Sequence, residues 1–103
     1  MELINEKNFK EKTSKGLVVV DFFANWCGPC RMLSPILEEV QEELGDKVKI
    51  YKVNVDEEEN LSRQFGIMSI PCVIFFKNGE VADKQIGLVS KDILISKIEN
   101  VAK

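Results

Sequence analysis

Two cysteines spaced three residues apart are the groups in this chain best suited to chemistry. The stretch Cys27-Gly28-Pro29-Cys30 follows an apolar run, and its glycine and proline favour a turn that opens into a helix. Positions i and i+3 of a first helical turn are neighbours, so the two sulfurs can close a small disulfide ring. The free N–H groups of the helix start stabilise an anion, which favours Cys27 as the thiolate and Cys30, one turn further in, as the less exposed partner.

This pair predicts thiol–disulfide exchange. Cys27 attacks a substrate disulfide to form a mixed disulfide, and Cys30 then attacks Cys27 and expels the reduced substrate. Gly28 permits close approach of another chain, and Pro29 supplies a fixed φ that helps to hold the turn. Because the two electrons come from the thiols, we expect no cofactor.

Half of a zinc site is the main alternative interpretation of a CxxC motif. A structural zinc site normally has four Cys or His ligands, but this chain has three cysteines and no histidine. Only the distant Cys72 remains as a further sulfur ligand. We therefore expect no metal. The absence of histidine also excludes Cys/His and Ser/His nucleophile pairs.

The elements on either side of the dithiol must position it. Leu17–Phe23 is a continuous apolar run of β-branched and aromatic residues, which predicts a strand covered on both faces, with Asp21 as its anomaly. The following helix shows apolar residues at three- and four-residue spacing and is closed by Gly45. Pro35 lies inside this pattern and predicts a kink.

The rest of the chain predicts an α/β fold. The pattern indicates a short leading strand and a charged helix within residues 4–15 (N-cap Asn5 or Asn8), a strand at 48–55, a helix at 57–65, strands at 72–76 and 80–86 joined by Asn78-Gly79, and a last helix capped by Ser90. The order is a βαβ unit followed by a ββα unit. This order predicts a mixed central sheet with helices on both faces.

Composition narrows the classes of partner. The net charge of −3 over 103 residues provides no basic field for nucleic acid or anionic lipid. Residues 1–6 lack the features of a signal peptide, and no stretch approaches the length of a membrane span. We expect residues 1–103 to form a single domain that is cytoplasmic and monomeric. The scattered glycines match neither a dinucleotide fingerprint nor a phosphate loop.

Beyond the CxxC motif, the sequence resembles the thioredoxin family along nearly its whole length and in the family's order. The matching segments are Val20–Arg31 with Trp26-Cys27-Gly28-Pro29-Cys30, then Pro35, Lys52–Asp56, Gly66-Ile67, Ile70-Pro71, Phe76–Glu80 and Gly87. The resemblance implies the thioredoxin fold and a protein-disulfide reductase. It also implies disulfide-containing protein substrates and a separate thioredoxin reductase, either NADPH-linked or ferredoxin-linked, that recharges the dithiol.

The resemblance also implies roles for individual residues. Asp21 matches a buried carboxylate behind the resolving cysteine, where it can accept the proton of Cys30, and Lys52 matches the amine beside that carboxylate. A satisfied buried aspartate and a solvated strand lysine are the alternatives. Residues matching the surface that receives substrate are Trp26, Gly28, Pro29, the cis-proline dipeptide Ile70-Pro71, and Gly87. For Trp26 core packing is the alternative, and for Pro71 it is an ordinary strand-initiating proline.

Cys72 departs from the family pattern, since threonine is usual after the proline. We expect either an inert buried residue or, if it is exposed near Cys27, a regulatory thiol open to oxidation. Phe23 and Arg31 stand where tryptophan and lysine are frequent. Two other functions remain open at this stage: a disulfide isomerase of the same fold, and a binding or chaperone subunit whose dithiol is incidental.

Overall fold

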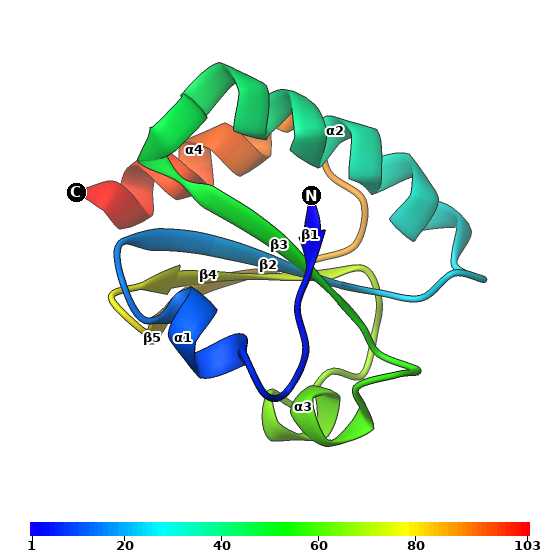
Figure 1. Ribbon diagram of the computed structural model, residues 1–103. Coiled ribbons are helices and arrows are strands. Elements are labelled where there is room, and N and C mark those ends of the chain that lie inside the picture. Colours follow the sequence, from blue (N-terminus) through cyan, green and yellow to red (C-terminus); the bar gives the residue numbers. More distant parts are fainter.

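The fold is built on one five-stranded mixed sheet. In the computed structural model, which describes residues 1–103, the strand order is β1-β3-β2-β4-β5 (Figure 1). The strands are β1 (Glu2–Leu3), β2 (Leu17–Phe23), β3 (Lys49–Asn54), β4 (Cys72–Lys77) and β5 (Glu80–Ile86). Strands β1 and β2 run parallel to β3, whereas β4 runs antiparallel to both β2 and β5. The predicted mixed sheet is therefore confirmed.

Helices cover both faces of this sheet. The long helix α2 (Gly28–Leu44) and the C-terminal helix α4 (Lys91–Ala102) lie on one face, while the short helices α1 (Phe9–Thr13) and α3 (Glu59–Gln64) lie on the other (Figure 1). A single 3₁₀ turn, Gly45–Lys47, follows α2. None of the helices is long and apolar enough to cross a membrane.

The central strand β2 carries the core on both of its faces, as its sequence predicts. Val18, Val20 and Phe22 pack towards α1 and α3, whereas Val19 packs with the apolar stripe of α2 and with α4. The members of that second cluster are Val19, Leu33, Leu37, Val40, Val48, Ile50, Val73, Phe75, Leu94 and Ile98. Because side chains alternate along a strand, Asp21 lies on the same face as Val19, beneath α2.

The N-terminal strand lies earlier than the sequence predicts. Glu2 and Leu3 pair with β3, while Ile4 is buried in the core, so the strand ends one residue before the predicted segment begins. Asn8 does occupy the N-cap position of α1, but its side chain makes no capping hydrogen bond. Instead the Asn5 N–H donates to Asn8 Oδ1 at 2.8 Å and the Asn8 N–H donates to Asn5 Oδ1 at 3.0 Å. This reciprocal pair holds the turn between β1 and α1.

Other predicted boundaries hold within two residues. The hairpin between β4 and β5 turns through Asn78 and Gly79, whose φ angles of 50° and 87° are those that an Asn-Gly turn requires. Ser90 Oγ caps α4 by accepting from the Ile93 N–H at 3.3 Å. Pro35 lies inside α2 without ending it, although it has no N–H to donate to the preceding turn.

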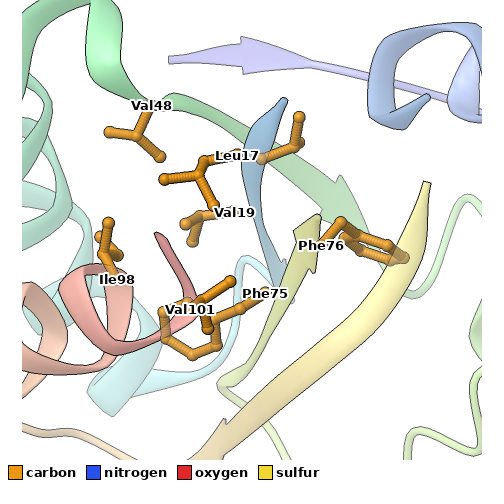
Figure 2. Close-up of a pocket in the computed structure, with 8 residues that line it drawn as sticks. Leu17, Val19, Val48, Phe75, Phe76, Ile98 and Val101 are labelled. Atoms are coloured by element: carbon orange, nitrogen blue, oxygen red, sulfur yellow. The ribbon is translucent and has the colours of Figure 1, made fainter. Parts of the chain in front are cut away.

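An apolar crevice lies at the end of the sheet opposite the dithiol. Figure 2 shows it where α4 meets the start of β2 and the end of β4. All of its lining residues are hydrophobic: Leu17, Val18, Val19, Val48, Phe75, Phe76, Ile98 and Val101. It has essentially no volume available to a water molecule, so it is a seam in the core packing rather than a ligand site.

Candidate active site

The two sulfurs lie at the junction between the end of β2 and the start of α2. Cys27 and Cys30 form a disulfide with a Cα–Cα distance of 5.2 Å, and Cys27 is the N-cap residue of α2. The Cys30 N–H donates to Cys27 Sγ at 3.2 Å, so the sulfur takes the place of the hydroxyl or carboxylate oxygen that usually caps a helix. Pro29 lies in the first turn, where its missing N–H costs nothing. The end of the helix therefore holds the sulfur of Cys27 at its most electropositive point.

The dithiol is largely buried, and its two members differ in the predicted sense. Cys27 is 5% exposed and Cys30 is 2% exposed. Both pack in a small cluster with Phe23 and Ala24, against which Ile70 also lies. A Cβ placed on Gly28 would meet no atom within 4 Å, so the surface beside the disulfide is open to another chain.

Side-chain contacts fix the loop that precedes the disulfide. Trp26 is 69% exposed, yet its Nε1 donates to Asp56 Oδ2 at 2.9 Å, which ties the indole to the segment after β3. The Arg31 guanidinium donates to the carbonyl oxygen of Asn25 at 2.8 Å. The indole is thus an ordered, exposed apolar surface next to Cys27, and the core-packing alternative for Trp26 is wrong.

The segment before β4 forms the other wall of the site. The Ile70–Pro71 peptide bond is cis, and the Ile70 carbonyl oxygen lies 3.9 Å from Cys27 Sγ. The Gly87 N–H donates to the Pro71 carbonyl oxygen at 2.8 Å. Gly87 has a φ of 91°, a conformation that favours glycine. The start of β4 therefore lies between the ends of β2 and β5, at one end of the strands of the sheet.

Asp21, on the face of β2 that α2 covers, is buried without a hydrogen-bond partner. Its side chain is fully buried, and neither carboxylate oxygen accepts a hydrogen bond. Burial disfavours the charged form and raises the pKa of Asp21 from 3.8 to about 7, although the positive charge of Lys52 acts in the opposite direction. No donor of the protein itself therefore satisfies this carboxylate.

Lys52 is the cross-strand neighbour of Asp21, but it does not form an ion pair with it. The two residues are in register between β2 and β3, yet no Lys52 N to Asp21 O distance is 4.0 Å or less. Instead Lys52 Nζ donates to Ser34 Oγ on α2 at 3.2 Å and lies 4.2 Å from the centre of the Phe23 ring. Lys52 is half-buried.

A cleft of about 200 Å³ opens between these groups and the surface. Its lining consists of Phe23, Ala24, Asn25, Cys30, Arg31, Ser34 and Lys52. This volume is enough for several water molecules, and Cys30 and Lys52 both line it. No group of three or more His, Cys, Asp or Glu side chains in the molecule is arranged to hold a metal ion.

Comparison with known proteins identifies the family. The thioredoxin family model matches residues 1–100. The chain belongs to the thioredoxin family. It is 45% identical over 89 residues to the thioredoxin of Bacillus subtilis (strain 168), a match that covers 86% of each chain. It is 50% identical over 91 residues to the thioredoxin of Listeria monocytogenes, covering 88% of each chain.

A solved structure supports the same assignment. The crystal structure of Malassezia sympodialis thioredoxin (Mala s 13) superposes with a TM-score of 0.89 at 37% sequence identity, covering 99% of this chain and 93% of that one. The thioredoxin fold predicted from the sequence is thus confirmed. Together with the Cys27–Cys30 disulfide, membership of the thioredoxin family establishes a dithiol–disulfide oxidoreductase that reduces disulfides in proteins.

Cys72 lies outside the surface of this thioredoxin-family site. It is 2% exposed and packs in the core between the sheet and α1 and α3. Burial raises the pKa of its thiol, which favours the unreactive protonated form. The exposure that a regulatory thiol would need is not met, because the strand alternation that follows Pro71 turns this side chain inwards.

Two contributors to the thioredoxin-family site were missed by sequence reasoning. Ser34 lies four residues after Cys30, so the helical period places both on the face of α2 that meets the sheet. That spacing could have identified Ser34 from the sequence as a neighbour of Cys30. Asp56 was matched only as part of a motif, and its hydrogen bond to Trp26 joins positions 30 residues apart, which no local pattern reveals.

Proposed function

We propose that Cys27 is the attacking thiolate, Cys30 the resolving thiol and Asp21 the proton acceptor in the reduction of protein disulfides. The observation that carries this proposal is the disulfide at the start of α2, with Cys27 as the cap and Cys30 one turn behind it. A thiolate at the cap position gains the hydrogen bond from the Cys30 N–H and the favourable field of the helix end.

The exchange proceeds in two balanced steps. The Cys27 thiolate attacks one sulfur of the substrate disulfide; a mixed disulfide forms, and the other substrate sulfur leaves as a thiolate that takes a proton from solvent. The Cys30 thiolate then attacks Cys27 Sγ, which forms the Cys27–Cys30 disulfide and releases the second substrate sulfur as a thiolate. The substrate has gained two electrons and the dithiol has lost two.

Asp21 prepares Cys30 for the second step. Its carboxylate accepts the proton of the Cys30 thiol, which yields the Cys30 thiolate and a neutral Asp21. Its pKa of about 7 supports this role, because a base is most useful when its pKa is near the working pH. Lys52, on the adjacent strand, moderates that pKa through its charge.

Substrate docks on the apolar rim around the disulfide. Trp26, Ile70 and Pro71 present the walls, Gly28 and Pro29 leave the approach to Cys27 open, and Gly87 holds the Pro71 carbonyl group. The extended backbone of a substrate lies alongside Ile70-Pro71 as an added strand would. This arrangement suits protein substrates of varied sequence.

The partners are disulfide-containing proteins and a separate reductase that returns two electrons to the Cys27–Cys30 disulfide. The reductase is NADPH-linked or ferredoxin-linked. Residues 1–103 act as one domain, the chain works as a monomer, and it works in the cytoplasm.

Trapping of the mixed disulfide tests these roles. Cys30→Ser can complete only the first step, so we expect it to accumulate a covalent complex with a disulfide-containing protein, seen on non-reducing gels. Cys27→Ser is the matched control and should form no such complex. A Cys27→Ser variant that still captured substrate, or a Cys30→Ser variant that turned over normally, would contradict the assignment.

The role of Asp21 has its own test. With Asp21→Asn we expect release of the mixed disulfide to slow by about 10²-fold above neutral pH, which is the lower end of the range for a lost general base. Stopped-flow measurement of the single-turnover rate checks this. An unaltered rate at pH 8 would remove Asp21 from the mechanism.

A further inference from the structure

Two sets of groups inside the site compete to bind the Lys52 ammonium. One is the Asp21 carboxylate, its in-register neighbour on β2, whose oxygens have no hydrogen-bond partner. The other is the pair of groups that it contacts, Ser34 Oγ at 3.2 Å and the Phe23 ring centre at 4.2 Å. A buried carboxylate normally attracts the nearest amine strongly, so something must hold the ammonium away.

The holding groups come from different elements. Ser34 belongs to α2 and Phe23 is the last residue of β2, so their contacts hold the ammonium between a helix and the sheet. A ring face attracts a cation electrostatically, and the serine hydroxyl accepts one of the three ammonium N–H bonds. Both residues line the cleft, as do Cys30 and Lys52.

We propose that Ser34 and Phe23 are positioning residues that hold the Lys52 ammonium at the cleft, out of ion-pair contact with Asp21, and so leave the carboxyl group free to take up and release a proton. This inference rests on the role of Asp21 given under the proposed function. It assigns to Ser34 on α2 an effect on the protonation of Asp21 on β2, although the two side chains form no hydrogen bond.

The surroundings of Asp21 make Lys52 the dominant charge in this balance. The register partner of Asp21 on β3 is Lys52, and its register partner on β4 is the uncharged Val73. Arg31 lines the cleft, but its guanidinium is engaged with the Asn25 carbonyl group. Cys72 on β4 points to the other face; burial is the main cause that raises the pKa of its thiol, Lys84 lowers it, and the Asp21 charge adds a smaller rise.

The proposal predicts a shift in the titration of Asp21 when Ser34 loses its hydroxyl group. In Ser34→Ala the ammonium lacks its only side-chain acceptor and moves to the carboxylate, so we expect the Asp21 midpoint to fall by about 1 pH unit. Ser34→Thr keeps a hydroxyl group and should retain the wild-type midpoint. Phe23→Leu removes the ring face and should shift the midpoint in the same direction as Ser34→Ala.

A double-mutant cycle shows whether Ser34 acts through Lys52. Lys52→Met should raise the Asp21 midpoint, because it removes the one positive charge that lowers it. In the Lys52→Met background, Ser34→Ala should have no further effect. The measurement is the ¹³C chemical shift of the Asp21 carboxyl carbon against pH, made on the disulfide-bonded protein, with circular dichroism to confirm that each variant is folded.

The outcomes separate this inference from the proposed function. An unchanged midpoint in Ser34→Ala, or an equal shift with and without Lys52, would overturn the inference while the role of Asp21 stands. A midpoint that shifts as expected, with the pH profile of mixed-disulfide release unmoved, would support the positioning by Ser34 and would refute Asp21 as the proton acceptor.

Discussion

The burial of Asp21 must make the stability of this protein depend on pH. In the folded chain the pKa of Asp21 is about 7, against 3.8 for the ordinary group, because burial disfavours its charge. The folded state therefore holds a proton that the unfolded chain has lost between these two values. The contribution of Asp21 to stability is therefore highest below pH 4, falls as the pH rises through this window, and is constant above the folded pKa.

The magnitude follows from the same two values. At pH 5 the unfolded chain has already lost the Asp21 proton, whereas the folded protein keeps it up to its pKa of about 7. The free energy of unfolding therefore falls over about two pH units, at about 1.36 kcal/mol per unit, which is a loss of roughly 2.7 kcal/mol for the wild type between pH 5 and pH 9. Asp21→Asn cannot ionise and escapes this loss. Any constant cost of burying the amide cancels when the two pH values are compared.

Urea unfolding of the disulfide-bonded protein at pH 5 and pH 9 measures the effect. The stability of Asp21→Asn relative to wild type should rise by roughly 2.7 kcal/mol between the two conditions. Asp46→Asn, at an exposed aspartate in the turn after α2, is the matched control and should follow the wild type at both pH values. Parallel pH dependence of Asp21→Asn and wild type would refute the reasoning.

Three further outcomes are expected. Leu37→Ala, at a fully buried position on α2, should lower the free energy of unfolding by about 2–5 kcal/mol in urea titrations. Met32→Ala, on the exposed face of the same helix, should change it by about 0.5 kcal/mol or less. Equal effects of the two variants would contradict the assignment of Leu37 to the core. Trp26→Phe loses the hydrogen bond to Asp56 and should raise KM for a protein disulfide about fivefold with little change in stability, and an unchanged KM would exclude the indole from substrate docking. Cys72→Val should keep activity and lose less than about 1.5 kcal/mol of stability, and mass spectrometry after brief alkylation of native wild-type protein should find Cys72 unlabelled; rapid labelling would restore the regulatory interpretation.

The architecture of the sheet could be predicted because local and global signals agree. The unbroken apolar run of Leu17–Phe23 reads as a strand covered on both faces, and the Asn78-Gly79 turn forces the last two strands to pair antiparallel. The leading strand was misplaced because a two-residue strand has no periodicity. Its position is set by tertiary burial of Ile4, which no local pattern of residues 2–4 records.

The site could be predicted in part. The dithiol and its order of exposure follow from spacing and the helix start alone, and Asp21 stands out as a charge in an apolar strand. Side-chain partners across elements could not be predicted, because the strand pattern places Lys52 next to Asp21 but does not say that Ser34 and Phe23 hold its ammonium. The inward direction of Cys72 depends on the register with Phe22, which is a property of the folded sheet.

The central claim is that the start of α2 holds the sulfur of Cys27 as a reactive thiolate with Cys30 shielded behind it. The most direct measurement is the rate of iodoacetamide alkylation of the freshly reduced protein at pH 7, resolved by residue with mass spectrometry. We expect Cys27 to react faster than a cysteine in an unstructured peptide and Cys30 to react more slowly than that peptide. A Cys27 that reacts no faster than the peptide thiol would contradict the account.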